Sequence, residues 1–198
     1  MHRYVIRQDS RASYEVVVDA ASGDLQPLGL QRLSAGGSVV QTSAGSGVGR
    51  SRSLRWVNSG AVVDGERVVV TSGNCGTGCG ADDTYRIRFY ETTGLVARFN
   101  NAGGQGTVLV LQNPGASAVT GQVYLWSGAG TLLGSAPFTL PSRGSLALNT
   151  ATIAGAAGKA GSITVAHDAP YGVLTGKAVA LEPATGFSFD TPLVAKPR

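Results

Sequence analysis

Apolar and polar side chains alternate with a period of two residues along most of this chain, and this pattern limits the fold more than any other feature. In the segment Tyr85–Tyr90, a tyrosine, an isoleucine and a phenylalanine share one face of an extended chain, and two arginines share the other. This pattern is typical of a half-buried β-strand. No 3.6-residue helical period is sustained, and Gly- and Pro-containing turns such as Asn113–Gly115 separate the alternating segments.

The alternation predicts an all-β fold, and the number of segments favours an immunoglobulin-like antiparallel β-sandwich. The segments expected to form strands are Arg3–Gln8, Tyr14–Asp19, Gly37–Thr42, Ser51–Asn58, Glu66–Ser72, Thr84–Thr92, Val96–Asn100, Thr107–Asn113, Gly121–Ser127, Thr131–Leu140, Gly144–Asn149, Gly161–His167, Leu174–Glu182 and Phe187–Thr191. About seven short strands in about 100 residues form one such sandwich. The 198 residues therefore predict two sandwich-like units: an N-terminal β unit with a cysteine loop over residues 1–95, and an immunoglobulin-like β-sandwich over residues 96–198. One continuous sandwich remains the alternative.

A weak internal repeat supports two related units. The segment Leu54–Ala61, followed by Gly65–Gly73, resembles Val110–Ala116, followed by Gly121–Gly128. Each copy has a strand, a turn with Asn, Gly and Ala, a second strand and a glycine-rich end. The copies lie about 55 residues apart, which is shorter than one complete sandwich, so the repeat indicates shared parts rather than a strict tandem duplication.

Charge argues against a nucleic-acid partner, and the short apolar runs argue against a membrane span. The formal net charge of +4 comes from 16 Lys and Arg against 12 Asp and Glu, and the positive charge is spread over both halves of the chain. Acidic residues are interspersed among the arginines, so no basic lobe of the kind that contacts a phosphate backbone is present, and we expect no nucleic-acid partner. No window approaches about 18 continuous apolar residues, so we expect no membrane span.

Cys75 and Cys79 lie in the glycine-rich segment Asn74–Gly80. A zinc site normally needs four ligands, and the spacing differs from that of a Cys-x-x-Cys redox motif. Gly76 and Gly78 permit the backbone of a small ring, so we predict a Cys75–Cys79 disulfide. A disulfide implies an oxidising compartment, which predicts an extracellular or cell-surface protein. The first residues lack the apolar core of a signal peptide, so we expect a mature or excised piece of a longer precursor.

The sequence contains few residues that could form a catalytic site. His167 shares a strand face with Ile163 and Val165, which predicts a buried core histidine, and the alternation puts its neighbour Asp168 on the opposite face. The Gly-x-Ser-x-Gly pattern of a nucleophile elbow does not occur. We therefore predict no catalytic residues and no enzymatic activity, with a glycosidase or an esterase as the alternative.

Asp82 and Asp83 follow the cysteine loop and are candidate metal ligands, with calcium as the ion. The alternating Asp/Asn spacing of a calcium loop is missing, so an exposed turn is the simpler interpretation. No other cofactor is expected.

Aromatic side chains offer a different kind of ligand site. Trp56 and Trp126 lie beside expected core residues, so a core role is favoured for both. Tyr171 lies in the turn Asp168–Gly172 and is expected to be exposed. Tyr171 and Trp126 are the candidate ligand-binding residues, with a glycan as the ligand.

Several segments resemble the C-terminal region of large, uncharacterised secreted or cell-surface proteins of environmental bacteria. These segments are Arg98–Asn101, Thr107–Pro114, His167–Gly172, Gly176–Pro192 and the Cys75–Cys79 loop with Asp82–Arg86, and the resemblance covers roughly residues 50–198. It implies a secreted β-sandwich module near the C-terminus of a larger chain. No activity, ligand or site residue is known for that family, so the resemblance transfers none.

The composition suggests how the protein works. Charged residues make up 14% of the chain, against about 25% in an average domain, and a surface rich in small residues is suited to burial against another protein. We therefore expect a non-enzymatic extracellular structural or interaction module, a self-associating surface, adhesive or filament-type subunit. Its partner would be itself, as a homo-oligomer or filament, or another cell-surface protein. The alternative is a carbohydrate-binding accessory module of a larger secreted protein.

Overall fold

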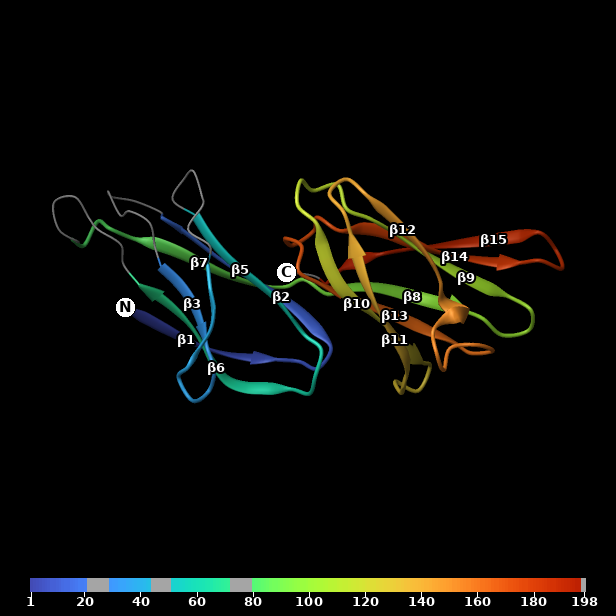
Figure 1. Cartoon of the computed structure of the whole chain (residues 1–198), viewed down its shortest axis with the longest axis horizontal. Helices are drawn as coiled ribbons and strands as arrows, with labels where there is room; N and C mark the ends of the chain where they lie inside the picture. Colours follow the sequence, from blue (N-terminus) through green and yellow to red (C-terminus); the bar gives the residue numbers. More distant parts are fainter. Residues whose placement is uncertain (21–28, 44–50, 72–79, 197–198) are drawn as a thin grey trace. The chain divides into compact units, whose positions relative to one another are not determined.

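The computed structural model describes residues 1–20, 29–43, 51–71 and 80–196. Within these ranges the chain forms β-strands, turns and one 3-10 helix, and no α-helix (Figure 1). The strands are β1 (His2–Gln8), β2 (Ala12–Ala20), β3 (Gly29–Leu33), β4 (Val39–Thr42), β5 (Ser51–Asn58), β6 (Val63–Thr71), β7 (Tyr85–Glu91), β8 (Gly94–Asn100), β9 (Gly106–Gln112), β10 (Val119–Ser127), β11 (Leu132–Leu140), β12 (Ser145–Asn149), β13 (Ala160–His167), β14 (Thr175–Glu182), β15 (Phe187–Pro192) and β16 (Val194–Ala195), and the 3-10 helix is η1 (Thr150–Thr152).

The all-β prediction is confirmed, and every expected strand is found with its ends shifted by a few residues at most. Two short strands were not predicted, β3 and β16. In β3 the fully buried Leu30 is followed two residues later by Arg32. The Arg32 side chain is largely buried and lies beside the carboxylate of Glu66. Alternation of hydropathy does not reveal a strand whose inward side chain is a paired arginine.

The chain divides into two compact units. The first contains Met1–Ser10 and Tyr14–Tyr90, and the second contains Arg11–Ser13 and Glu91–Arg198. The division in the structure falls between Tyr90 and Glu91, a few residues before the boundary expected from the sequence. Each unit has its own buried apolar cluster.

The first unit consists of a four-stranded sheet, in the order β1-β6-β3-β4, and a three-stranded sheet, in the order β5-β2-β7. Alternate side chains of both sheets point inward, as the period of two requires. The buried cluster comprises Val16, Val18, Leu30, Leu54, Trp56, Val68 and Val70. Trp56 is 6% exposed, so its predicted core position is confirmed.

The second unit pairs a five-stranded sheet, β11-β10-β13-β8-β16, with a four-stranded sheet, β12-β9-β14-β15. All their strand pairs are antiparallel. The buried cluster of this unit includes Phe99, Leu109, Leu111, Val123, Leu125, Phe138, Leu140, Ile153, Ile163, Val165 and Leu174. None of the sheets in the described ranges closes into a barrel, so the architecture is consistent with a β-sandwich.

The strand order of the second unit differs from the immunoglobulin pattern. In an immunoglobulin constant domain, the first strand shares a sheet with the second and fifth, and the seventh shares a sheet with the third and sixth. Here β8, the first strand of the unit, lies in the sheet of β10 and β13, and β14, the seventh, lies in the sheet of β9 and β12. The immunoglobulin-like detail of the prediction is therefore not confirmed.

The weak sequence repeat corresponds to a shared corner in the two units. The side-chain oxygen of Asn58, at the end of β5, accepts a hydrogen bond from the N–H two residues later (3.1 Å), and its NH2 group donates to two backbone carbonyls (2.7 and 2.8 Å). Asn113, after β9, makes the same three bonds at 3.0, 2.8 and 2.9 Å. In each unit this corner takes the chain from one sheet to the other.

Candidate functional site

His167, at the end of β13, is 3% exposed and lies in the same buried row as Ile163 and Val165. The carboxylate of Asp168 is bound elsewhere: its two oxygens accept hydrogen bonds from the N–H and the hydroxyl of Thr120, both at 2.8 Å. The Nδ1 atom of His167 has no hydrogen-bond partner. A serine hydrolase needs an accessible imidazole that a carboxylate orients, and His167 has neither property.

Burial also decides the charge of His167. Removal from water disfavours the imidazolium and lowers the pKa of His167 to about 4, although the negative charge of Asp168 acts in the opposite direction. At neutral pH the ring is therefore an uncharged part of the interior of the second unit. Its geometry supports a structural role.

Asp82 and Asp83 lie in an exposed turn. One oxygen of Asp83 accepts a hydrogen bond from the N–H of Gly80 (2.8 Å), and the N–H of Asp83 donates to the Gly80 carbonyl (3.2 Å). Among the described residues, no group of three or more His, Cys, Asp or Glu side chains comes together as metal ligands would. Cys75 and Cys79, for which we predict a disulfide, lie outside the described residues.

Tyr171 is half-buried rather than exposed. Its hydroxyl donates a hydrogen bond to the backbone carbonyl of Lys196 (2.8 Å), close to the end of the described chain. The phenol therefore joins two segments of the second unit. A turn residue is exposed only when no distant segment of the chain covers it. The sequence of the turn does not show that the segment at Lys196 covers Tyr171.

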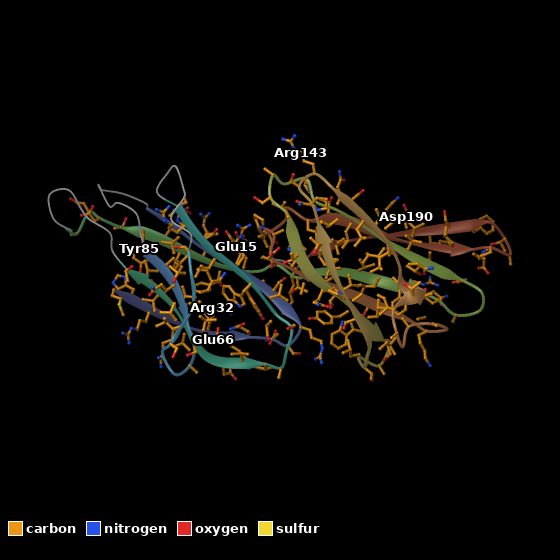
Figure 2. All side chains as sticks on the ribbon, viewed as in Figure 1. Glu15, Arg32, Glu66, Tyr85, Arg143 and Asp190 are labelled. Atoms are coloured by element: carbon orange, nitrogen blue, oxygen red, sulfur yellow. The ribbon has the colours of Figure 1, made fainter. Side chains whose placement is uncertain are left out.

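A polar network that the sequence analysis missed lies in the first unit. The indole N–H of Trp56 donates to the side-chain carbonyl of Gln8 (2.8 Å), and the Gln8 amide donates to the carboxylate of Glu66 (2.6 Å). Glu66 lies 3.4 Å from the guanidinium of Arg32 (Figure 2). Arg32 in turn stacks over the Trp56 ring, with 4.6 Å from Cζ to the ring centroid. The four side chains Trp56, Gln8, Glu66 and Arg32 therefore form a closed cycle of contacts.

This network satisfies most of the polar atoms that it buries. The side chains of Arg32 and Glu66 are each 14% exposed. Desolvation lowers the pKa of Arg32, and the charge of Glu66 opposes that effect. Each charge compensates the other in the interior of the first unit, and the network links side chains of β1, β3, β5 and β6.

Trp126 is half-buried and lies on the solvent side of the five-stranded sheet. Its strand neighbour Leu125 and the residue Ile163 on β13 point into the core, so the period of two places Trp126 on the outer face. The indole N–H donates to the hydroxyl of Thr164 (2.9 Å), and the guanidinium of Arg11 lies 5.9 Å from the ring centroid. The predicted core position of Trp126 is therefore wrong.

Beside Trp126 the outer face is hollowed. The hollow has a volume of about 520 Å³ and is lined by Ala97, Trp126, Ser127, Gly128, Gly130, Gly161, Ser162 and Thr164. A second hollow of about 420 Å³ shares Ala97, Ser162 and Thr164 with the first and continues to Leu95, Thr191, Pro192 and Val194. None of the residues that line the two hollows carries a charge. We call the two together the Trp126 groove.

A second exposed feature lies on β15, at the edge of the four-stranded sheet. Phe187 and Phe189 are 66% and 60% exposed, and Leu181 on the paired strand β14 is 45% exposed. Phe189 lies opposite Ala180 in the β14–β15 pair, and Thr191 opposite Ala178. Opposite residues point to the same side, and Ala178 is in the core, so the two phenylalanines project from the core-facing side of the sheet without being covered.

The edge of β8 is also incompletely covered, and β11 and β12 are the terminal strands at the opposite ends of the two sheets. β16 pairs with β8 at Gly94 and Leu95, and no described strand pairs with the remainder of that edge, from Val96 to Asn100. Unpaired backbone donors and acceptors at a sheet edge can accept a strand from another chain.

For β15, the alternation in Phe187–Phe189 predicted a strand, but the exposure of both rings follows from the position of β15 at the edge of its sheet.

No described segment forms a helix with the length and hydropathy that crossing a membrane requires. Comparison with the models of known protein families gives no match to the chain, and comparison with curated proteins gives no match either. The functional inference therefore depends on the geometry of the β15 edge, the Trp126 groove and the buried His167.

Proposed function

We propose that this protein is a non-enzymatic, extracellular interaction module that associates with a second copy of itself through β15. The observation that carries the proposal is the pair of exposed rings, Phe187 and Phe189, on an edge strand. Native proteins usually protect a sheet edge with charges, proline, bulges or a covering element. β15 has one charged residue, Asp190, which forms an ion pair with Lys177 on β14 (2.5 Å), and one proline, Pro192, at its last position. The segment Phe187–Phe189 contains neither a charge nor a proline.

That ion pair lies on the other side of the hairpin from the rings. Asp190 is opposite Val179 in the β14–β15 pair, and Val179 alternates with the buried Ala178. The Asp190–Lys177 pair therefore faces away from the core, and the other side of the hairpin carries the two exposed rings, with Glu182 opposite Phe187. Pairing of β15 with β15 of a second copy would extend the sheet and bring the rings of both copies together, which is a symmetric way to cover an apolar edge.

The energetic gain from covering the rings is substantial. Complete burial of one phenylalanine side chain contributes on the order of 2 kcal/mol. Removal of both rings from each copy is therefore expected to weaken association by roughly a hundredfold or more.

The test is sedimentation and light scattering of the full chain over a wide concentration range. The wild type is expected to form a dimer or larger particle that dissociates on dilution, and Phe187→Ser with Phe189→Ser is expected to remain a 20.1 kDa monomer. The matched control is Val39→Ser with Val40→Ser, which removes two exposed apolar residues from β4, the edge strand of another sheet. A monomeric wild type at every concentration, or loss of association in the control alone, contradicts the proposal.

A further inference from the structure

We propose that the Trp126 groove, on the outer face of the second unit, is a binding site for a neutral oligosaccharide. The groove does not contain Phe187 or Phe189, but it reaches Thr191 and Pro192 at the other end of β15. Substitution of the two phenylalanines therefore tests self-association separately from this proposal. A glycan site requires an apolar surface on which a sugar ring can stack and polar groups that bind its hydroxyls. The groove has both.

Trp126 provides the stacking surface, and its position is fixed by two contacts. The hydrogen bond from its indole N–H to Thr164 sets the direction of the ring, and the guanidinium of Arg11 lies 5.9 Å from the ring centroid. Such a cation–π contact stabilises one orientation of an indole. A ring that is held in place before the ligand arrives loses little conformational freedom on binding, which favours affinity.

Hydroxyl groups lie along the floor and rim of the groove. Thr164 uses its oxygen to accept from Trp126, so its hydroxyl proton is available to donate to a ligand. Ser162 lies opposite Trp126 in the β10–β13 pair and lines both hollows. Ser127 accepts hydrogen bonds from the N–H groups of Ala129 and Thr131 (3.2 and 3.1 Å), which orders the turn at the rim. The polar groups are therefore placed by the sheet and its turn.

The chemistry of the lining selects the class of ligand. No Lys, Arg, Asp or Glu side chain is among the residues that line the two hollows, although Arg11 lies 5.9 Å from the centroid of the Trp126 ring. The lining itself is therefore suited to an uncharged ligand. Three glycines, at positions 128, 130 and 161, line the hollow next to the ring and let a ligand approach the backbone closely. The groove crosses from β10 over β13 to β8 and β16, three strand spacings or about 14 Å. That span fits a short oligosaccharide better than a single sugar.

The experiment titrates the full chain with neutral and acidic probes and follows the two indole N–H signals by NMR. The neutral probes are soluble hexamers of β-1,4-glucose, β-1,4-xylose, β-1,4-mannose and α-1,4-glucose, and the acidic probe is oligogalacturonate. The chain has two tryptophans, so Trp56, buried in the first unit, is an internal reference for Trp126. We expect at least one neutral probe to shift the Trp126 signal with a Kd between about 10 µM and 1 mM, and to leave the Trp56 signal unchanged.

Three variants give the proposal its specificity. Trp126→Ala is expected to weaken binding at least about tenfold, and Thr164→Val to weaken it by less. Tyr171→Phe, outside the groove, is the matched control and is expected to bind as the wild type does. Each variant is first compared with the wild type in its amide spectrum, so that loss of binding is not confused with loss of the fold.

Two results overturn the proposal. One is the absence of any shift of the Trp126 signal with every neutral probe at about 10 mM. The other is equal binding by the wild type and Trp126→Ala, which would place the ligand elsewhere. If no probe binds and Trp126→Ala lowers self-association, the groove is a contact between copies and the glycan assignment is wrong. The Phe187 and Phe189 variants are expected to retain glycan binding, so the two proposals can fail separately.

Discussion

The second unit is expected to lose stability between neutral and acidic pH because His167 is buried. Replacement of His167 by glutamine is expected to abolish this loss. In the folded protein burial lowers the pKa of His167 to about 4, whereas an unfolded histidine has a pKa of about 6.5. Between these values the unfolded chain binds a proton that the folded chain does not bind. Stability is therefore at its full value above about pH 6.5 and falls as the pH approaches 4.

The size of this effect follows from the two pKa values. A pKa of about 4 in place of about 6.5 corresponds to a loss of about 3 kcal/mol in the free energy of unfolding at pH 4. Because a domain of this size is stable by only about 5 to 15 kcal/mol, the loss is large enough to measure. The side chain is 3% exposed, so solvent screening reduces it little.

Two measurements test the prediction. In a His2→Gln background His167 is the single histidine, and its ring signals in an NMR titration are expected to change with a midpoint near pH 4. Urea unfolding is then followed by fluorotryptophan signals, since Trp56 and Trp126 report on different units. The Trp126 transition is expected to lose about 3 kcal/mol more between pH 7 and pH 4 in the wild type than in His167→Gln.

The comparison with His167→Gln isolates the contribution of His167, because every other side chain is the same in both proteins. A ring titration near pH 6.5, or an equal loss of stability in the wild type and His167→Gln, would refute the reasoning. The Trp56 transition serves as the control, since His167 belongs to the other unit.

Three further substitutions and one control substitution test the packing of the two units, each by urea unfolding with the tryptophan of that unit as the reporter. Glu66→Gln leaves the buried charge of Arg32 without its ion-pair partner and is expected to cost roughly 3 kcal/mol in the first unit; a change below about 0.5 kcal/mol would show that water reaches the pair. Gly121→Ala places a methyl group against a carbonyl of β13 and an aromatic ring of β11 and is expected to cost about 1 to 3 kcal/mol. Gly128→Ala, which meets nothing within 4 Å, should stay within about 0.5 kcal/mol, and similar values for the two glycines would contradict the packing of β10. Asn113→Ala removes three hydrogen bonds at a fully buried corner and is expected to cost about 2 to 3 kcal/mol, so a neutral outcome would mean that the corner is not needed to join the sheets.

Much of the architecture was predictable because strand formation leaves a local signal. Alternation of apolar and polar side chains identifies a strand from its own sequence, as in Tyr85–Tyr90. The corner at Asn58 and Asn113 is likewise a local motif, in which the side chain accepts a hydrogen bond from a backbone N–H two residues later. The burial of His167 was predictable for the same reason, since Ile163 and Val165 precede it at intervals of two.

The candidate sites were less predictable, because exposure depends on strands that are distant in the sequence. Trp126 was expected in the core, but Leu125 beside it and Ile163 on the paired strand point into the core, which places Trp126 on the outer face of the sheet. Tyr171 was expected to be exposed, but the backbone of Lys196 returns to bind its hydroxyl. The stacking of Arg32 on Trp56 joins residues of two different sheets, and no local pattern records that contact.

The sequence by itself determined that this protein is built of antiparallel strands and that its interior histidine is buried, because alternation and turn residues act over a few positions. Only the tertiary structure decided which strand lies at an edge and which face of a sheet has no partner. Phe187 and Phe189 alternate like core residues, yet β15 is the last strand of its sheet and leaves them exposed. An edge is a property of the strand order, and strand order is set by long-range pairing that no single segment encodes.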